Sequence, residues 1–194
     1  MPILGIISSQ ISGHLFAPSG AYDSIATVTV GSPVSSITFS SIPATYTHLQ
    51  VRGITRNSAN VGGDAASFRF NSDSSSSYTR HYLAGNGATA SASYTTAVTE
   101  GYWGVNQADG SRTAGVFTPV IFDILDYANT SKLKTFRVLS GQDQNNSSSR
   151  LMFSSGFQTA ITAAITSLQF NVNTDYAGNF AEYSHFALYG IKGA

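Results

Sequence analysis

The sequence predicts an all-β protein, and within that class a jelly-roll-like antiparallel β-sandwich. Nearly every apolar stretch alternates with a period of two residues, which is typical of a strand with one buried face. These stretches are short and bounded by Gly, Pro, Ser, Asn or Asp, the residues that end strands and form turns. No repeat of fixed period is visible, which disfavours a propeller or a solenoid.

The first three strands follow from this alternation. Residues 24–30 alternate Ala and Val with Thr, and Ser35–Ile42 alternates until Pro43 ends it. His48–Ile54 places Leu and Val inward, and Gly53 suggests a bulge near its end. We therefore expect strands over Ser24–Val30, Ser35–Ile42 and His48–Ile54.

Two further strands flank a serine-rich turn at residues 71–77. Ser67–Asn71 carries two inward phenylalanines with Arg69 outward between them, and Tyr78–Leu83 follows the turn. The Asn and Asp spacing in that turn faintly resembles a calcium loop, but it lacks the central Gly and the closing Glu. We expect a solvated turn.

The second half repeats the pattern. Thr118–Asp126 is apolar on both sides, which favours a strand covered on both faces. Lys132–Ser140, Leu151–Phe157 and Ser167–Val172 alternate and follow in order. The only window compatible with a helix is Thr159–Ile165, which is short and rich in β-branched residues. Residues 86–94 and 106–111 are polar and small, which predicts exposed loop tips.

The last strand lies within residues 184–193. Phe186 and Leu188 fall on one face, and Ala187, Tyr189 and Ile191 on the other. Both faces have apolar side chains to bury, so this strand is expected to be central in a sheet or between subunits. About ten strands are expected in all.

The composition fits one domain with few charges. Of 194 residues, 42% are hydrophobic and 10% charged, against about 25% charged in an ordinary soluble protein. Hydroxyl and amide side chains supply the polar surface, and they cost less to desolvate than charges. This suits a neutral secreted or viral domain, or a protein that packs against copies of itself or another subunit.

Charge and cysteine content exclude several classes. Ten basic and ten acidic residues cancel and no segment concentrates one sign, which disfavours a nucleic-acid partner because such proteins carry a basic stripe. The chain has no cysteine, so disulfides and thiolate-bound metals are excluded. The absence of cysteine does not indicate whether the protein works in a reducing or an oxidising compartment.

Residues 1–20 are interpreted as an apolar N-terminal arm, and residues 21–194 as a single β-sandwich domain. The arm has no positive n-region, and polar residues interrupt its apolar run, so it does not fit an export signal. The run is also too short to span a bilayer, so no membrane insertion is expected. The arm either docks on another subunit or forms a first strand of the same core. Its expected anchors are Ile3, Leu4, Ile6, Ile7, Ile11, Leu15 and Phe16.

No catalytic, metal or cofactor site is expected. The four histidines, His14, His48, His81 and His185, stand singly in different segments, without metal-ligand spacing or a recognisable triad. His48 and His81 are interpreted as structural. Serines abound without a nucleophile elbow. The chain is therefore expected not to be an enzyme.

Asp123 and Asp126 are the closest pair of acids in a strand-to-turn segment. Alternation places them on opposite faces of one strand, which disfavours a shared glycosidase site. We expect Asp123 to pair with a neighbouring Arg or Lys, and Asp126 and Asn129 to close a turn.

Aromatic residues make up 12% of the chain. An aromatic ring with a polar tip can stack on a sugar or anchor a protein interface, although many tyrosines only cap a core. The cluster at residues 100–104 is the strongest candidate, and its rings are expected at strand ends or in loops. The candidate ligand or interface aromatics are Tyr94, Tyr102 and Trp103.

Several blocks resemble structural proteins of tailed bacteriophages, of the kind called tail-fibre or decoration proteins. The blocks are residues 3–13, 22–30, 37–53, 122–130 and 186–193, spread from end to end. The resemblance implies a non-enzymatic virion component with a β-sandwich fold, assembled as a homotrimer on the exterior of the particle. It carries no catalytic residues.

Two functions follow from this resemblance and from the composition. The first is a head decoration or cement subunit that contacts the major capsid protein or a fibre or tail protein. The alternative is a receptor- or carbohydrate-binding module of a tail or head fibre, with a host surface glycan as ligand. An enzyme such as a depolymerase is a distant third.

Overall fold

The computed structural model describes residues 20–60, 64–143, 149–172 and 178–193. These residues form twelve strands in two antiparallel sheets, with no helix among them. The sandwich-like all-β architecture expected from the alternation is therefore confirmed, with two strands more than expected. The expected arm and its anchors in residues 3–16 lie outside the described residues, as does His14. No helix that could span a membrane occurs in the described part of the chain.

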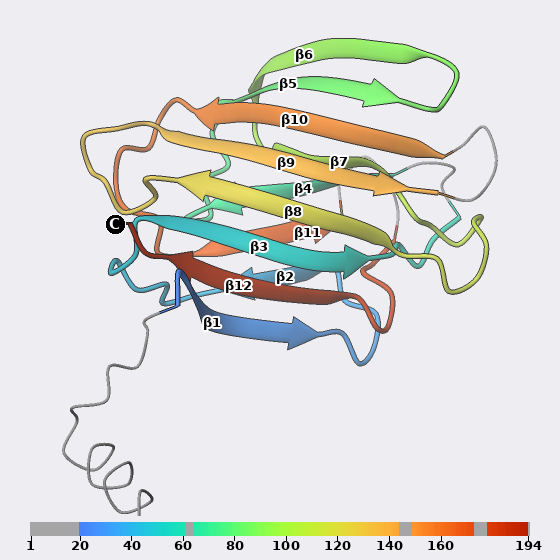
Figure 1. Ribbon diagram of the computed structural model, residues 1–194, viewed down its shortest axis with the longest axis horizontal. Coiled ribbons are helices and arrows are strands. Elements are labelled where there is room, and N and C mark those ends of the chain that lie inside the picture. The colour runs from blue at the N-terminus through green and yellow to red at the C-terminus, as the bar shows by residue number, and fades with distance from the viewer. Residues whose placement is uncertain (1–19, 61–63, 144–148, 173–177, 194) are drawn as a thin grey trace, which may run out of the picture.

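The larger sheet has eight strands, and it lies nearest the viewer in Figure 1. Every neighbouring pair in it is antiparallel. In spatial order the strands are β1 (Tyr22–Thr29), β12 (His185–Ile191), β3 (His48–Thr55), β8 (Thr118–Leu125), β9 (Lys134–Gln142), β10 (Arg150–Gln158), β5 (Tyr78–Gly85) and β6 (Ala90–Val98).

The smaller sheet has four strands and lies behind the larger one (Figure 1). In order these are β2 (Ser36–Phe39), β11 (Leu168–Val172), β4 (Asp64–Phe70) and β7 (Gly101–Gln107). We call the side of the larger sheet that packs against it the inner face, and the opposite side the outer face. No second layer of described residues covers the outer face, and this leaves one side of the larger sheet open.

Aromatic rings fill the space between the sheets. The ring of Phe68 lies 4.7 Å from that of Phe122 and 4.8 Å from that of Phe136, measured between centroids. Phe170 and Phe186 stack at 5.1 Å. All five side chains are almost completely buried. Because burying each such ring stabilises the fold by about 1.5–3 kcal/mol, this cluster is the main source of cohesion between the layers.

The strand near the C-terminus is central, as its two apolar faces predicted. β12 pairs with β1 on one side and with β3 on the other. Gly53 in β3 does not form the expected bulge, because the register runs through it without a shift. A Cβ atom there would lie 2.7 Å from the backbone oxygen of His185, so close approach of two strands explains the glycine.

Two predicted loops are strands. Residues 90–94, expected at a loop tip, begin β6, and residue 106, expected in another tip, lies in β7. Ala90, Ala92 and Asn106 have low strand propensity, and pairing with a neighbouring strand outweighs that preference. The window Thr159–Ile165 is not helical, and Ile165 instead donates its backbone N–H to Tyr127 O.

Candidate interaction surface

Large apolar side chains lie exposed on the outer face. They project from five neighbouring strands, β3, β8, β9, β10 and β5, and each is between 39% and 61% exposed. Such residues are common singly on a protein surface but not side by side. We call the neighbouring members of this set the outer apolar band; they are Ile54, Leu83, Ile121, Leu139, Leu151 and Phe153. Phe157 on β10 is also 39% exposed, but it is opposite Thr79 and Thr135 and lies outside the band.

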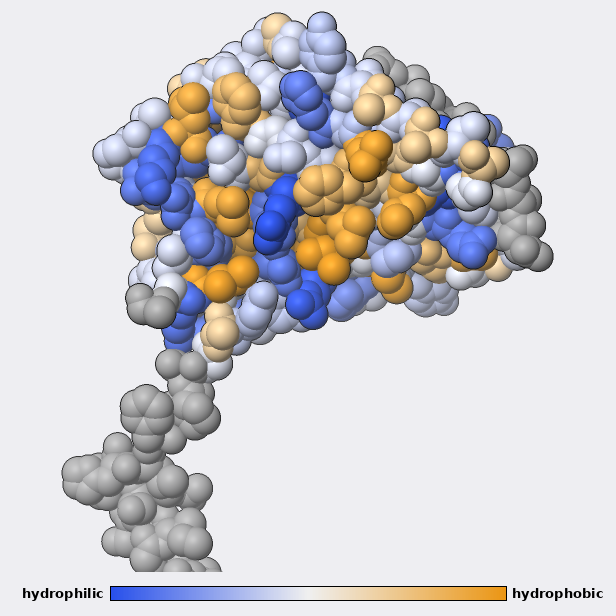
Figure 2. Space-filling view, turned by 45° about the horizontal axis from the view of Figure 1, so that its top comes forward, coloured by the Kyte–Doolittle hydropathy of each residue, from blue (hydrophilic) through white to orange (hydrophobic). Residues whose placement is uncertain are grey.

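The strand register makes the band continuous. Phe153 is directly opposite Leu83 on one side and Leu139 on the other, and Leu139 is opposite Ile121. Directly opposed residues on one face of an antiparallel pair have Cβ atoms about 4.5–5.5 Å apart. Four large side chains therefore form a row across four strands. Figure 2 shows apolar and hydrophilic side chains gathered in adjoining patches on this side of the molecule.

A hydrogen-bonded polar row runs beside the band, also across the strands. Gln50 donates to Asp123 Oδ1 at 2.7 Å and accepts from Arg52 Nε at 2.8 Å. Arg137 Nε donates to Asp123 Oδ2 at 2.8 Å. The prediction that Asp123 pairs with a basic neighbour is confirmed. We call Arg52, Gln50, Asp123 and Arg137 the polar row.

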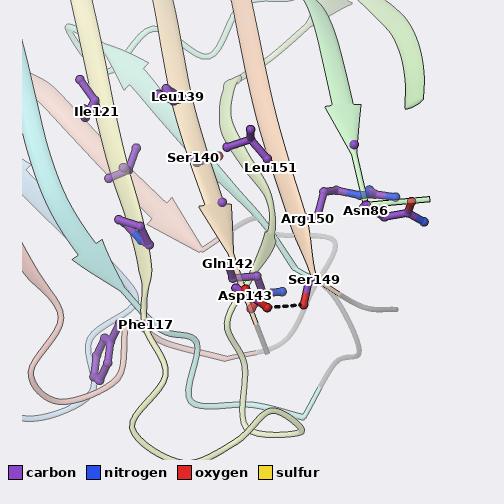
Figure 3. A pocket seen from close by; sticks show the side chains of 15 residues that line it. Asn86, Phe117, Ile121, Leu139, Ser140, Gln142, Asp143, Ser149, Arg150 and Leu151 are labelled. Carbon is purple, nitrogen blue, oxygen red and sulfur yellow. Dashed lines mark hydrogen bonds between the residues drawn. The ribbon is translucent and has the colours of Figure 1, made fainter. Parts of the chain in front are cut away.

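A hollow of about 760 Å³ lies at one end of the band. Ile121, Leu139 and Leu151 form its apolar side, and Figure 3 shows them on three neighbouring strands. Its polar end includes Asp143, which accepts a hydrogen bond from Ser149 Oγ at 3.1 Å. The hollow is a depression in the sheet surface and is continuous with the outer apolar band.

A second, smaller hollow of about 440 Å³ lies toward the β6 edge. The rings of His81 and Tyr94 stack beside it at 5.5 Å between centroids, with 23° between their planes. Phe153 and the hydroxyl residues Ser93 and Ser155 also contribute to its lining. Of the three candidate aromatics, Tyr94 is the one exposed on this surface, at 66%.

Tyr102 and Trp103 were expected at a strand end or in a loop, and both lie in β7 as its second and third residues. Trp103 is 1% exposed, donates its indole N–H to Ser67 O at 3.0 Å and packs edge-on against Phe170. It is a core residue and presents no ring to a surface ligand. Tyr102 is half-buried under the guanidinium of Arg80. The expected aromatic cluster is therefore split between the core and a stacking contact.

Three histidines lie in the described residues and apart from one another. His48 Nδ1 accepts the backbone N–H of Asp126 at 2.9 Å, and His185 Nδ1 bonds the hydroxyl of Thr29 at 2.9 Å. His81 stacks on a tyrosine as described. Asp126 also accepts from Lys132 Nζ at 2.5 Å. The expected turn is present: the backbone N–H of Asn129 donates to the backbone oxygen of Asp126, and the side-chain Oδ1 of Asn129 accepts the backbone N–H of Ser131 at 2.8 Å.

The serine-rich turn is organised around one carboxylate. Asp73 Oδ2 accepts hydrogen bonds from Ser75 Oγ, Ser77 Oγ and Gln158 Nε2, at 2.9, 2.9 and 2.6 Å. Burial opposes its ionisation, but these bonds outweigh that effect and lower the pKa of Asp73 below its ordinary value. The carboxylate thus ties the turn to β10.

Among the described residues, no group of three potential ligands from His, Cys, Asp and Glu is placed to hold a metal ion.

Comparison with known proteins finds no relative of this chain. No protein-family model matches the chain, and no curated protein or solved structure matches it. Function is therefore inferred from the surface itself.

Sequence reasoning missed the outer apolar band, although a signal for it was present. The apolar residues on both sides of Thr118–Asp126 predicted a strand covered on both faces. In the structure one face is covered, and Ile121 on the other is 39% exposed. The same two-sided apolar pattern recurs at Leu139 in β9 and at Phe153 in β10. The pattern indicated a second buried face that the described chain does not itself bury.

Proposed function

We propose that this chain is a non-enzymatic structural protein of a bacteriophage virion, a head decoration or cement subunit that attaches through the outer face of its eight-stranded sheet. The observation that carries the proposal is the outer apolar band. The resemblance of five sequence blocks to phage virion proteins and the charge-poor composition support the choice of particle.

The band has the features of a protein interface. Contiguous exposed apolar side chains on a folded domain mark interaction sites. Here they lie on a broad sheet face with a polar row alongside, which matches the apolar centre and hydrogen-bonding rim of protein–protein interfaces. In the polar row, Asp123 is held by Gln50 and Arg137, so docking there does not bury an isolated carboxylate.

A cement subunit stabilises a particle by burying such surface between subunits. Removing apolar area from water contributes about 25 cal/mol per Å², from which the entropy of association is subtracted. The arm, with anchors from Ile3 to Phe16, is proposed as a second attachment to a neighbouring subunit. The jelly-roll-like connectivity and the homotrimer stay predictions.

The test is attachment of charged variants to particles. Virions of the encoding phage that lack this protein are mixed with wild-type chain, with Leu139→Lys or with Thr27→Lys, and sedimented. Thr27 is exposed on the outer face of β1, away from the band, so its lysine is the matched control. We expect Leu139→Lys to lose at least about tenfold in affinity, because a desolvated charge costs more than 1.4 kcal/mol. Equal attachment of both variants would contradict the docking face.

Location on the virion is tested separately by electron cryomicroscopy. A decoration subunit is expected on the capsid lattice with its eight-stranded sheet toward the major capsid protein. Density at the tail tip or on a fibre would favour the alternative, a receptor- or carbohydrate-binding module. Absence of the chain from purified virions would reject both.

One observation favours that alternative. The stacked rings of His81 and Tyr94 lie beside a small hollow that Ser155 also lines, and a sugar ring binds to such an aromatic face with a hydroxyl nearby. Tyr94→Ala is expected to remove binding to host glycans on an array, with Tyr22→Ala, another exposed tyrosine, as control. Unchanged binding by Tyr94→Ala would exclude this hollow.

A further inference from the structure

The two sheets have four edges, and three of them are protected against pairing with another strand. β1 has a register shift between Ser24 and Ala26. β7 has two register shifts against β4. β2 is only four residues long. Bulges and short edge strands are devices by which proteins avoid edge-to-edge association.

The fourth edge, β6, has a register shift only near its end, between Arg80–Thr95 and Tyr78–Val98, and this leaves six consecutive pairs regular. It is nine residues long, and residues 88–98 contain no proline and no charged residue. Its register against β5 is unbroken from Arg80–Thr95 to Gly85–Ala90. Most of its residues are exposed, and of its nine residues only Val98, at its end, packs against the hydrophobic core. Among the described residues, no strand pairs with its other side, and Figure 1 shows it as the outermost strand of the larger sheet.

The hairpin geometry shows which backbone groups are available. Asn86 N–H donates to Thr89 O at 3.2 Å, which closes the hairpin with a hydrogen-bonded pair. Hydrogen-bonded and non-hydrogen-bonded pairs alternate along an antiparallel ladder. Counting along the register, Ser91 and Ser93 direct their N–H and C=O groups toward β5. Ala90, Ala92 and Tyr94 direct theirs outward, to the open edge.

We propose that β6 is a self-association edge: it pairs antiparallel with β6 of a second copy of this chain, across a two-fold axis at Ala92. In that register Ala92 meets Ala92 of the second copy, and Ala90 meets Tyr94. The three outward residues of each copy then form about six hydrogen bonds between the chains. The free backbone groups of one β6 edge pair with those of the identical edge in the second copy. No further copy can then be added at this edge, as in other two-fold interfaces.

Side-chain size and charge agree with a second copy as the partner. Cross-strand neighbours on the outer face would be Tyr94 and Ala90 of opposite chains, a large residue against a small one. On the inner face only serine and threonine side chains would meet. Because residues 88–98 are uncharged, the two copies bring no like charges together. Leu83 is opposite Ala92 within each chain, so the outer apolar bands of both copies would lie on one continuous sheet.

The first test is the mass of the full chain in solution. By sedimentation equilibrium from about 1 to about 200 µM, wild type is expected to approach two chains of 20.4 kDa each. Ala92→Pro removes an outward N–H and leaves the β5 ladder intact, and it is expected to raise the dissociation constant at least about tenfold. Leu83→Lys changes the outer face without touching the edge groups, and is expected to keep the dimer. A monomer throughout this range would overturn the proposal. A trimer would overturn it in favour of the homotrimer that the sequence resemblance implies.

A second readout does not depend on any variant folding. Amide hydrogen exchange measured by NMR is expected to protect Ala90, Ala92 and Tyr94 only at high protein concentration. Ser91 and Ser93 are expected to be protected at every concentration, because their N–H groups bond β5. Free exchange at Ala92 under conditions where dimer is present would show that association uses another surface. Loss of the dimer in Leu83→Lys but not in Ala92→Pro would show that this surface is the outer apolar band.

Discussion

The guanidinium carbon of Arg80 lies 4.6 Å from the centre of the Tyr102 ring and 5.0 Å from that of Tyr82. Arg80 is 8% exposed, and its Nε and Nη1 donate to no acceptor among the described residues. Burial lowers the pKa of Arg80, the direction expected for a charge taken out of water. Two aromatic rings thus take the place that a carboxylate usually occupies beside a buried arginine.

Arg80→Met is expected to stabilise the protein. Stacking of the guanidinium on the rings contributes about 1–2 kcal/mol, whereas each buried donor without an acceptor costs about 1–3 kcal/mol. Methionine keeps the aliphatic stem and packs on aromatic rings. We expect a rise in Tm of about 2–4 °C by calorimetry, for a gain of about 1 kcal/mol. Tyr102→Phe keeps the ring and is the control, with little change expected; a lower Tm for Arg80→Met would contradict the prediction.

Tyr78 makes stability depend on alkaline pH. Burial raises the pKa of Tyr78 to about 12 from an ordinary value near 10. Because the folded pKa is higher, the stabilisation is complete below about pH 10 and is lost as the pH rises toward about 12. Tyr78→Phe has no proton to lose, so its free energy of unfolding is expected to fall less between pH 8 and about pH 11, by about 1.4 kcal/mol. Urea unfolding at pH 8 and at about pH 11 measures the difference; parallel curves would refute it.

Tyr78→Phe also has a cost at neutral pH. The hydroxyl of Tyr78 accepts the backbone N–H of Phe70 at 3.0 Å, and the variant leaves that buried donor without a partner. We expect a loss of about 1–2 kcal/mol at pH 7. The two effects are separable because only the first depends on pH.

Asp73 gives the opposite dependence at acidic pH. Its folded pKa is lowered, so its contribution is present above the ordinary carboxyl pKa of about 3.9 and is lost as the pH falls through the lower folded value. Asp73→Asn is expected to be less stable than wild type at pH 7, with the difference shrinking near about pH 2. Urea midpoints at the two pH values test this. If the difference in stability between wild type and Asp73→Asn is the same at both pH values, the loss comes from the geometry of the amide in the turn and not from the missing charge.

Gly190→Ala is expected to destabilise the fold by about 2 kcal/mol, because a Cβ there would fall 2.3 Å from the Tyr46 ring. Gly31→Ala is the matched control, since no atom lies within 4 Å of its Cβ position. The Tm values of both variants, measured by thermal unfolding, test this prediction. Equal Tm values would mean that the Tyr46 ring moves away without loss.

The alternation of apolar residues predicted most of the fold because each strand has one face in the aromatic core. β11, for example, was predicted at 167–172 and found at Leu168–Val172, where Leu168 and Phe170 are buried. β6 escaped prediction because only Val98, at its end, packs against that core, so the rest of the strand carries no apolar alternation to detect. Trp103 was expected at a strand end or in a loop, but its ring is buried in the core, and nearby Gly101 lies where a side chain would overlap Phe68.

The sequence indicated the character of the candidate surface but not its position. Apolar residues on both sides of Thr118–Asp126 predicted two covered faces, and only one of them is covered by the described chain. Which strands lie next to one another is decided by pairing across long stretches of chain, as between Ile121 and Leu139 or Arg52 and Ile121. Alternation in the sequence predicts which face of a sheet a residue lies on, but it does not predict which strands lie beside it.

The position of β12 between β1 and β3 has a consequence for biosynthesis. Residues 22–29 leave the ribosome more than 150 residues before their partner at 185–191, and an antiparallel ladder has no stability without its second strand. Pairing between such distant segments is slow, since the loop must close before any contact forms. The sheet is therefore completed only after residue 191 has been released. Until then the edges of β1 and β3 that pair with β12 have no partner.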